Sequence, residues 1–425
     1  MSDDLSVGAL PAGWAHNTLG ELTAATRPIC YGVLKPGDFV EGGVPLVRIL
    51  DIKGDRLSLA AVHRISDVLD AEFPRSRIRG GEVLLSIQGT IGRVAVAPAS
   101  AAGANISRTI AIIDPDGRTS ALFVRYWLMW ANATNQFKVG GTTRDSLNIG
   151  DIRELVVPIP SIPEQEKIVE ILEEQLSRLD AALEAVRAVR VKAAQFRRSL
   201  LHAAFTGALT GHDTSSGTLP NDWEEMTLEQ VAKWGSGGTP KSGTSSYYGG
   251  RIPWAVIGDL TESWVHETAQ SITQSGLDNS SAKVIEPGTV MLAMYGASIG
   301  RTGVTAKAMA TNQAIAFATP KAGVMDMQYL LKFLQSQKAA FVRAGQGGAQ
   351  PNISQTVIKP WPIPVPPLAE QEKIVEILEE QLSRLDASLA LANTVEKRAV
   401  ALRRSLLHAA FTGNLTKQWR ENAHV

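Results

Sequence analysis

Eight residues around Lys241 come close to the pattern of a phosphate-binding loop. Gly235 to Ser242 read GSGGTPKS, with a glycine, a lysine and a serine at the positions that a P-loop requires. A P-loop also has a glycine directly before the lysine, so that its backbone amides can wrap the phosphates. Here that residue is Pro240, which has no N–H group. The sequence therefore disfavours nucleotide binding by this segment.

Other residue types that carry out catalysis or bind metals are present without the spacing that either needs. The seven histidines show no ligand spacing, and the single cysteine, Cys30, excludes an internal disulfide and a cysteine-based metal site. There is also no Asn-Pro-Pro-aromatic methyltransferase motif and no recognisable nuclease carboxylate cluster. We therefore predict a chain that is not an enzyme, with no catalytic residues, metal or cofactor of its own.

The charge balance argues against a simple polycation. The 42 basic and 42 acidic side chains cancel, and residues 1–163 hold 16 of each while residues 202–369 hold 11 of each. A nucleic-acid binder with this composition needs a local basic face, or a partner that carries positive charge. Acidic residues at positions 3 and 4 and the lack of an ~18-residue apolar run predict a cytoplasmic protein without a membrane segment.

An internal duplication organises the chain. Glu164–Ala181 reads EQEKIVEILEEQLSRLDA, and the same residues recur at an offset of 206 as Glu370–Ala387. Arg197–Gly207 (RRSLLHAAFTG) recurs at that offset as Arg403–Gly413, and the diverged spacer between the blocks keeps its length. A continuous helix demands constant length, because one inserted residue rotates everything beyond it by about 100°.

Each copy has the marks of one long helix. Prolines precede both copies, Ser161 has capping-box spacing to Glu164, and Gly207 and Gly413 stand where a left-handed stop is expected. Roughly 40 residues lie between these marks, or about 60 Å of helix. The apolar spacing predicts a coiled-coil seam within the chain, with pairing between two chains as the alternative. The seam residues are Ile168, Leu172, Leu176, Leu179, Leu183, Val186, Ile374, Leu378, Leu382, Leu385, Leu389 and Ala392.

The segments outside the helices form a second, weaker repeat of two modules. Residues 81–93 match residues 288–301, and short apolar runs at 83–87, 94–97 and 290–294 predict strands. Residues 122–131 and 327–334 predict helices. We expect an α/β fold of the α+β type, with two mixed α/β modules that share a frame. The predicted boundaries are 1–160 for the first module, 161–210 for the first long helix, 211–366 for the second module, 367–417 for the second long helix and 418–425 for a tail.

This order of elements resembles the specificity subunits of type I restriction-modification systems. The resemblance is carried by EQ-x-x-I-V at the start of each long helix, A-A-F-T-G at its end, the G-G-T-P run at 237–240, and the strand with Trp254 and Asp259. It covers essentially the whole chain. Each motif is short, but the doubled and ordered set is specific.

The resemblance implies a division of labour among several subunits. The two modules would be target recognition domains, each reading one half of a bipartite, asymmetric site on double-stranded DNA. The long helices would form an antiparallel, pseudo-twofold coiled coil that sets the half-site spacing and docks two modification (methyltransferase) subunits. Motor-nuclease restriction subunits would complete the complex, with S-adenosylmethionine, ATP and Mg²⁺ bound by the partners.

Base reading requires polar side chains on loops that reach a groove of the DNA. Arg93 and Arg301 hold equivalent places, so we expect a shared role for them, whereas Gln88 and Tyr295 differ at matched places and are expected to set half-site specificity. The candidate DNA-binding residues are Lys53, Arg56, Arg64, Gln88, Arg93, Arg144, Thr239, Lys241, Ser242, Tyr247, Tyr248, Tyr295, Ser298, Arg301, Gln346 and Gln350. The alternative function is a structural coiled-coil scaffold that presents two protein-interaction domains.

Overall fold

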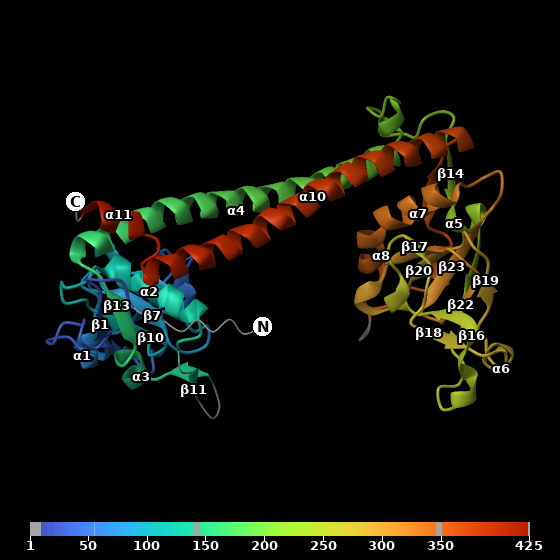
Figure 1. The fold of residues 1–425 in the computed structure, drawn as a ribbon. Helices are drawn as coiled ribbons and strands as arrows, with labels where there is room; N and C mark the ends of the chain where they lie inside the picture. Colours follow the sequence, from blue (N-terminus) through green and yellow to red (C-terminus); the bar gives the residue numbers. More distant parts are fainter. Residues whose placement is uncertain (1–9, 55, 138, 141–144, 346–350, 424–425) are drawn as a thin grey trace. The chain divides into compact units, whose positions relative to one another are not determined.

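The computed structural model describes residues 10–54, 56–137, 139–140, 145–345 and 351–423. The chain divides into two compact units (Figure 1). Unit 1 comprises residues 1–186 and 393–425, and unit 2 comprises residues 187–392. Each unit therefore holds one module and part of each long helix. In the described ranges, no helix is long and apolar enough to cross a membrane.

The module of unit 1 is built on an antiparallel sheet with the strand order β2-β10-β7-β8, beside a mixed sheet with the order β6-β3-β9. Helix α2 packs against β7 and β8. The strands are β1 (Ala15–Thr18), β2 (Cys30–Tyr31), β3 (Val44–Val47), β4 (Ile52–Lys53), β5 (Arg56–Leu57), β6 (His63–Ile65), β7 (Val83–Ser86), β8 (Val94–Val96), β9 (Asn105–Ile106), β10 (Ile110–Ile113), β11 (Val139–Gly140), β12 (Ser146–Leu147) and β13 (Val156–Ile159). The helices are α1 (Asp67–Glu72), α2 (Ala121–Ala133) and α3 (Ile149–Arg153).

The module of unit 2 repeats this plan with larger sheets, in the orders β15-β23-β20-β21-β17 and β18-β16-β22-β19. The strands are β14 (Glu224–Thr227), β15 (Ala232–Ser236), β16 (Tyr248–Ala255), β17 (Trp264–Val265), β18 (Gln270–Ile272), β19 (Val284–Ile285), β20 (Val290–Ala293), β21 (Thr302–Thr305), β22 (Met309–Thr311), β23 (Ile315–Pro320) and β24 (Pro362–Val365). The helices are α5 (Leu228–Val231), α6 (Gln274–Asp278), α7 (Met327–Ser336), α8 (Lys338–Ala344) and α9 (Gln355–Ile358).

The long helices are α4 (Ile162–Ala204) and α10 (Leu368–Phe411), and the short helix α11 (Lys417–Ala423) follows the second. In each unit they run antiparallel, so that the first part of one lies beside the last part of the other (Figure 1). An equivalent cross-helix ion pair occurs in both units. Asp180 and Arg403 lie 2.9 Å apart in unit 1, and Arg197 contacts Asp386 in unit 2. The predicted seam residues are all buried or half-buried.

The repeated Glu-Gln pair at the start of each long helix fastens that helix to its module. In unit 1, the Glu164 carboxylate accepts from the Trp14 indole at 3.1 Å, from the Thr416 hydroxyl at 2.6 Å and from Arg420. The Gln165 side chain donates to two carbonyl oxygens that precede the helix. The predicted capping box is therefore wrong, because the Glu164 side chain turns into the module and not back to the helix start.

The same attachment of long helix to module, called the joint below, recurs in unit 2 with one change. The Glu370 carboxylate accepts from the Trp223 indole at 3.1 Å, from the Thr210 hydroxyl at 2.5 Å and from the His212 imidazole at 2.8 Å. Burial on its own would raise the pKa of Glu370, but these hydrogen bonds outweigh burial and lower it. A histidine thus stands where unit 1 uses an arginine.

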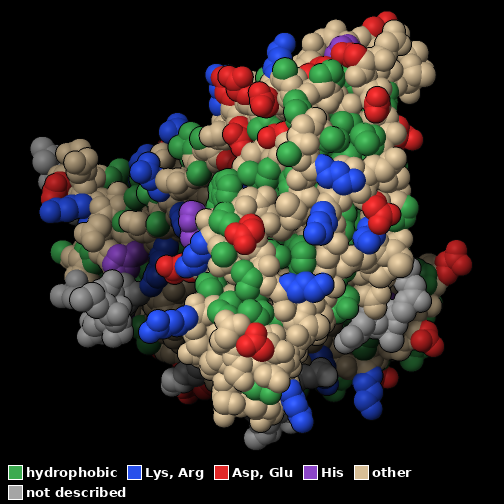
Figure 2. Space-filling model, turned by 90° about the vertical axis from the view of Figure 1, so that its right-hand side faces the viewer, with side chains coloured by type: hydrophobic (Ala, Val, Ile, Leu, Met, Phe, Trp, Pro, Cys, Tyr) green, Lys and Arg blue, Asp and Glu red, His purple; other side chains and the backbone are tan. Residues whose placement is uncertain are grey.

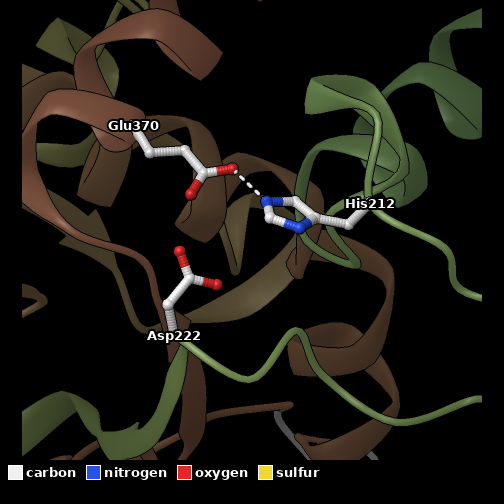
Figure 3. A group of neighbouring side chains, drawn as sticks. All are labelled: His212, Asp222 and Glu370. Carbon is white, nitrogen blue, oxygen red and sulfur yellow. Dashed lines mark hydrogen bonds and ion pairs between the residues drawn. The ribbon is translucent and has the colours of Figure 1, made fainter.

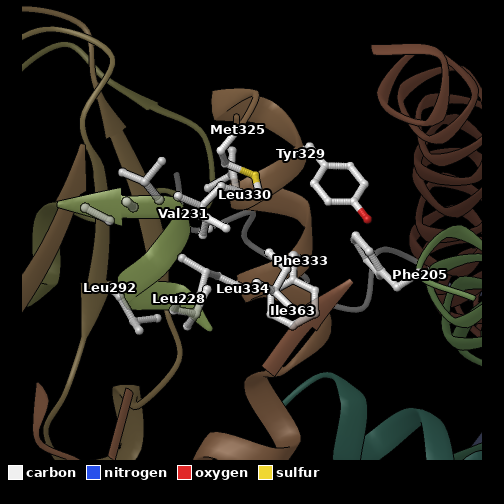
Figure 4. Close-up of a cluster of buried hydrophobic side chains, with 14 of the residues drawn as sticks. Phe205, Leu228, Val231, Leu292, Met325, Tyr329, Leu330, Phe333, Leu334 and Ile363 are labelled. Carbon is white, nitrogen blue, oxygen red and sulfur yellow. The ribbon is translucent and has the colours of Figure 1, made fainter. Parts of the chain in front are cut away.

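The end of each long helix supplies an aromatic ring to the core of the adjoining module. In unit 2, the Phe205 ring meets Tyr329 and Phe333 of α7 edge-on, with ring centroids 5.3 and 5.2 Å apart (Figure 4). In unit 1, Phe411 meets Phe123 of α2 in the same way at 5.4 Å. Both helices then stop at glycines with φ near +90° and +76°, as the left-handed stops predict. The predicted fold class, two mixed α/β modules with an antiparallel coiled coil, is confirmed.

Candidate nucleic-acid interface

In each unit, an inner strand of the main sheet leads into a loop that is held by the same backbone contact. After β7 of unit 1, the amide of Leu147 donates to the carbonyl of Ile87 at 2.9 Å. After β20 of unit 2, the amide of Ile353 donates to the carbonyl of Met294, also at 2.9 Å. The two loops, residues 88–92 and 295–300, therefore start from the same backbone frame.

The first side chain of each loop differs between the units. Gln88 is half-buried and forms a backbone bridge with Ser146, whereas Tyr295 is 43% exposed and forms the equivalent bridge with Asn352. One frame thus presents an amide in unit 1 and a phenol in unit 2. These groups hydrogen-bond differently, because an amide has separate donor and acceptor atoms, whereas a phenol has a single hydroxyl.

The two equivalent arginines that follow these loops make different contacts. The Arg93 guanidinium donates to the carbonyls of Ile49 and Ile52, at 3.3 and 3.1 Å, and so ties the loop base to the neighbouring turn. Arg301 is half-buried and makes no side-chain hydrogen bond or ion pair with any residue that the structure describes. The shared sequence position therefore does not give a shared contact.

The remaining described candidates in unit 1 belong to other segments than the loop at 88–92. Lys53 and Arg56 pair across the β4–β5 hairpin and are exposed. Arg56 lines a cavity of about 610 Å³ together with two acidic side chains of α4, Glu173 and Asp180. The Arg64 guanidinium donates to a backbone carbonyl at 2.6 Å and supports the turn before β3.

The G-G-T-P run in unit 2 is a tightly packed loop entry. A Cβ atom at Gly237 would lie 1.9 Å from the carbonyl oxygen of Thr311, so only glycine fits there. The Trp254 indole donates to the carbonyl of Gly238 at 3.1 Å, and the Tyr248 hydroxyl donates to that of Pro240 at 2.6 Å. A 3-10 turn and then β16 follow this run, and not the long helix of a P-loop.

This fixed run holds several candidate side chains at the surface. Thr239, Lys241 and Ser242 are exposed, and the Thr239 hydroxyl donates to the Gln313 side chain. Tyr247 and Ser298 are half-buried. The candidates Arg144, Gln346 and Gln350 lie outside the described residues.

The loop at 295–300 contains the letters of a nucleophile elbow, because residues 296–300 read GASIG. An elbow joins a strand to a helix and pairs its serine with a histidine. Here the loop joins the antiparallel strands β20 and β21, and Ser298 makes no side-chain hydrogen bond with a described residue. The described part of this loop therefore lacks the strand-to-helix frame of a nucleophile elbow.

Basic and acidic side chains are interspersed on the face drawn in Figure 2. Lysines and arginines stand singly among neutral side chains, and the described part of this face has no continuous basic surface. This arrangement agrees with the equal basic and acidic counts of the whole chain. This face by itself therefore offers no continuous positive surface to a polyanion.

Comparison with known proteins identifies the family. The family model for the type I restriction modification DNA specificity domain matches the chain twice, at residues 42–188 and 220–397. The chain belongs to the type I restriction-modification specificity subunits. The two matches mean that each unit of this specificity subunit contains one such domain. A purely structural scaffold is consequently not favoured.

Relatives share this assignment at moderate identity. The EcoBI specificity subunit of Escherichia coli is 30% identical over 208 residues, which are 47% of this chain and 43% of that subunit. The MjaIX subunit of Methanocaldococcus jannaschii is matched over only 39% of its length, and the EcoR124I/EcoR124II subunit over 64%. The putative MjaX subunit is 20% identical over 96% of this chain and 95% of its own.

Solved structures show the same fold along almost the whole chain. The HsdS subunit from Thermoanaerobacter tengcongensis superposes with a TM-score of 0.57 at 21% identity, over 96% of this chain and 99% of that one. A chain from a study of complex assembly and conformational transition of the type I R-M system superposes with a TM-score of 0.69 at 21% identity, over 96% and 100%.

Proposed function

We propose that this specificity subunit binds double-stranded DNA and that each module reads one half of a bipartite, asymmetric target. The observation that carries the proposal is the shared loop frame with different side chains, Gln88 in unit 1 and Tyr295 in unit 2. Two modules that share a backbone frame but carry different loop side chains would recognise two different short sequences. The Gln88 amide suits bidentate pairing with an adenine edge, and the Tyr295 ring suits contact with a thymine methyl group.

The subunit itself would be non-catalytic and would work within a larger complex. Its near-neutral surface supports a complex in which two modification subunits supply much of the phosphate neutralisation. Large apolar side chains on the long helices remain exposed and suit docking of such subunits. They are Val189, Val191, Phe196, Leu391, Val395, Val400 and Leu402. S-adenosylmethionine, ATP and Mg²⁺ would then be bound by the modification and motor-nuclease subunits.

Gln88→Ala and Tyr295→Ala should each alter a different half of the target. Loss of one good base contact costs about 1–3 kcal/mol of discrimination, so one half-site should become degenerate while the other stays unchanged. The measurement is the methylation pattern produced by each variant complex in a methylation-free host. Lys307→Ala, an exposed change away from both loops, is the control and should preserve the whole target.

Unchanged methylation patterns in both alanine variants would remove these two residues from the reading surface. Loss of methylation at every site in both variants would also contradict independent reading by the two modules. Circular dichroism of the variants distinguishes either result from unfolding.

A further inference from the structure

Three side chains that could bind a metal ion converge beside the joint between α10 and the module of unit 2. Ligand atoms of His212, Asp222 and Glu370 all lie within 4.8 Å of one another (Figure 3). Among the described residues, this is the one group of histidine, cysteine or acidic side chains with that geometry. The Asp222 carboxylate points toward the other two, and makes no hydrogen bond or ion pair with a described residue.

The equivalent joint in unit 1 shows what is electrostatically unusual here. There a single carboxylate, Glu164, is neutralised by the permanently charged Arg420. In unit 2, the second carboxylate of Asp222 is added where unit 1 has Gly13, and an imidazole replaces the guanidinium. Two converging carboxylates carry more negative charge than one imidazole can offset, which favours a bound cation.

We propose that His212, Asp222 and Glu370 bind one divalent transition-metal ion, which supplies the positive charge that Arg420 supplies in unit 1. One imidazole nitrogen and two carboxylate oxygens form a donor set suited to Zn²⁺. Tetrahedral ligand atoms around zinc lie about 3.4 Å apart. Ligand atoms here lie up to 4.8 Å apart, so the more distant ones must approach by at most about 1.4 Å. The 2.8 Å hydrogen bond between His212 and Glu370 would give way to two metal–ligand bonds, with these two atoms moving apart by about 0.6 Å.

The three ligands come from separate segments of unit 2. His212 follows α4, Asp222 precedes β14, and Glu370 lies in the first turn of α10. A shared ion would cross-link these segments and stabilise the joint, so its role would be structural. Sequence spacing gives no hint of this site, because Asp222 and Glu370 are far apart in the chain.

The test uses the full chain, stripped with a chelator and titrated with ZnCl₂ by calorimetry at pH 7.5. Wild type should bind one Zn²⁺ per chain and melt at a higher temperature when Zn²⁺ is present. Asp222→Asn and His212→Arg should bind Zn²⁺ at least tenfold more weakly. Glu224→Gln, which removes a nearby exposed carboxylate, is the matched control and should bind as wild type does.

His212→Arg separates metal loss from misfolding, because it reproduces the cation of the unit 1 joint. This variant should keep the melting temperature of metal-free wild type or exceed it. The proposal fails if wild type binds no Zn²⁺ at micromolar concentrations, or if Asp222→Asn and His212→Arg bind it as wild type does. It also fails if lowering the pH raises the melting temperature but Zn²⁺ does not. His212 would then pair with Glu370 only as a protonated side chain, without a metal ion.

Discussion

Arg27→Met should destabilise the module of unit 1 by about 3–5 kcal/mol, because it leaves a buried carboxylate without its cation. Arg27 and Glu82 are 5% and 1% exposed and form an ion pair, and Arg27 also contacts Asp114 at 3.3 Å. Glu82 further accepts from the backbone amides of Arg79 and Gly80, at 2.7 and 2.8 Å. The cost should appear as a lower urea midpoint for unit 1.

The effect of Arg27→Met should also depend on pH. Burial opposes ionisation of Glu82, but the hydrogen bond from Arg27 and the backbone amides lower its pKa overall. In wild type this stabilisation is therefore present above the unfolded-state pKa, about 4.3, and is lost as pH falls through the folded-state value. In the variant, burial dominates and raises the pKa of Glu82, so protonation relieves the cost. The difference in the free energy of unfolding between wild type and Arg27→Met should therefore become smaller as the pH is lowered from 7 to 4.

A matched control and a clear contradiction are available for this prediction. Arg118→Met removes an exposed arginine, 56% accessible, from its pair with Asp116, and should cost less than about 1 kcal/mol. If Arg27→Met costs no more than Arg118→Met, the buried pair does not stabilise the module. A cost that is the same at pH 7 and pH 4 would also contradict a role for the Glu82 charge.

Lengthening both long helices by one heptad should move the two half-sites apart without changing their bases. Seven residues inserted after Val189 and seven after Asn393 preserve the antiparallel register that pairs Asp180 with Arg403 and Arg197 with Asp386. Seven residues add about 10.5 Å of helix, or about three base pairs at 3.4 Å each. Genome-wide methylation mapping of the variant complex should show the original half-sites with a longer gap.

Insertions of one residue at the same two positions are the control for this experiment. They rotate everything beyond the insertion by about 100° and disrupt the seam, so methylation should be lost. An unchanged gap in the heptad variant would show that the helices do not set the spacing. New half-site bases would show that the insertion disturbed the modules themselves.

Local patterns in the sequence predict most of the fold. The strand expected at 83–87 is β7 at Val83–Ser86, and the helix expected at 327–334 is α7 at Met327–Ser336. These elements follow from hydrophobic periodicity over a few residues, and the exact recurrence of the helix sequences gives their bounds. The predicted domain boundaries and DNA-binding residues stay predictions.

Long-range polar contacts could not be predicted in this way. The Arg27–Glu82 pair and the hydrogen bond from Trp14 to Glu164 join residues 55 and 150 positions apart. No period or short motif connects such residues, because sheet topology brings them together. The repeated Glu-Gln pair is a motif in the sequence, but its attachment of each long helix to a module depends on distant partners such as Trp14 and Trp223.

The methylation pattern of the wild-type complex shows directly whether the two modules read two different half-sites. The chain is co-expressed with the modification subunit of its own system in a methylation-free host, and every methylated base in the genome is mapped. We predict one split, asymmetric motif, with two different short half-sites separated by a fixed number of unspecified bases. A single continuous motif, a symmetric one, or the same methylation without this chain would contradict it.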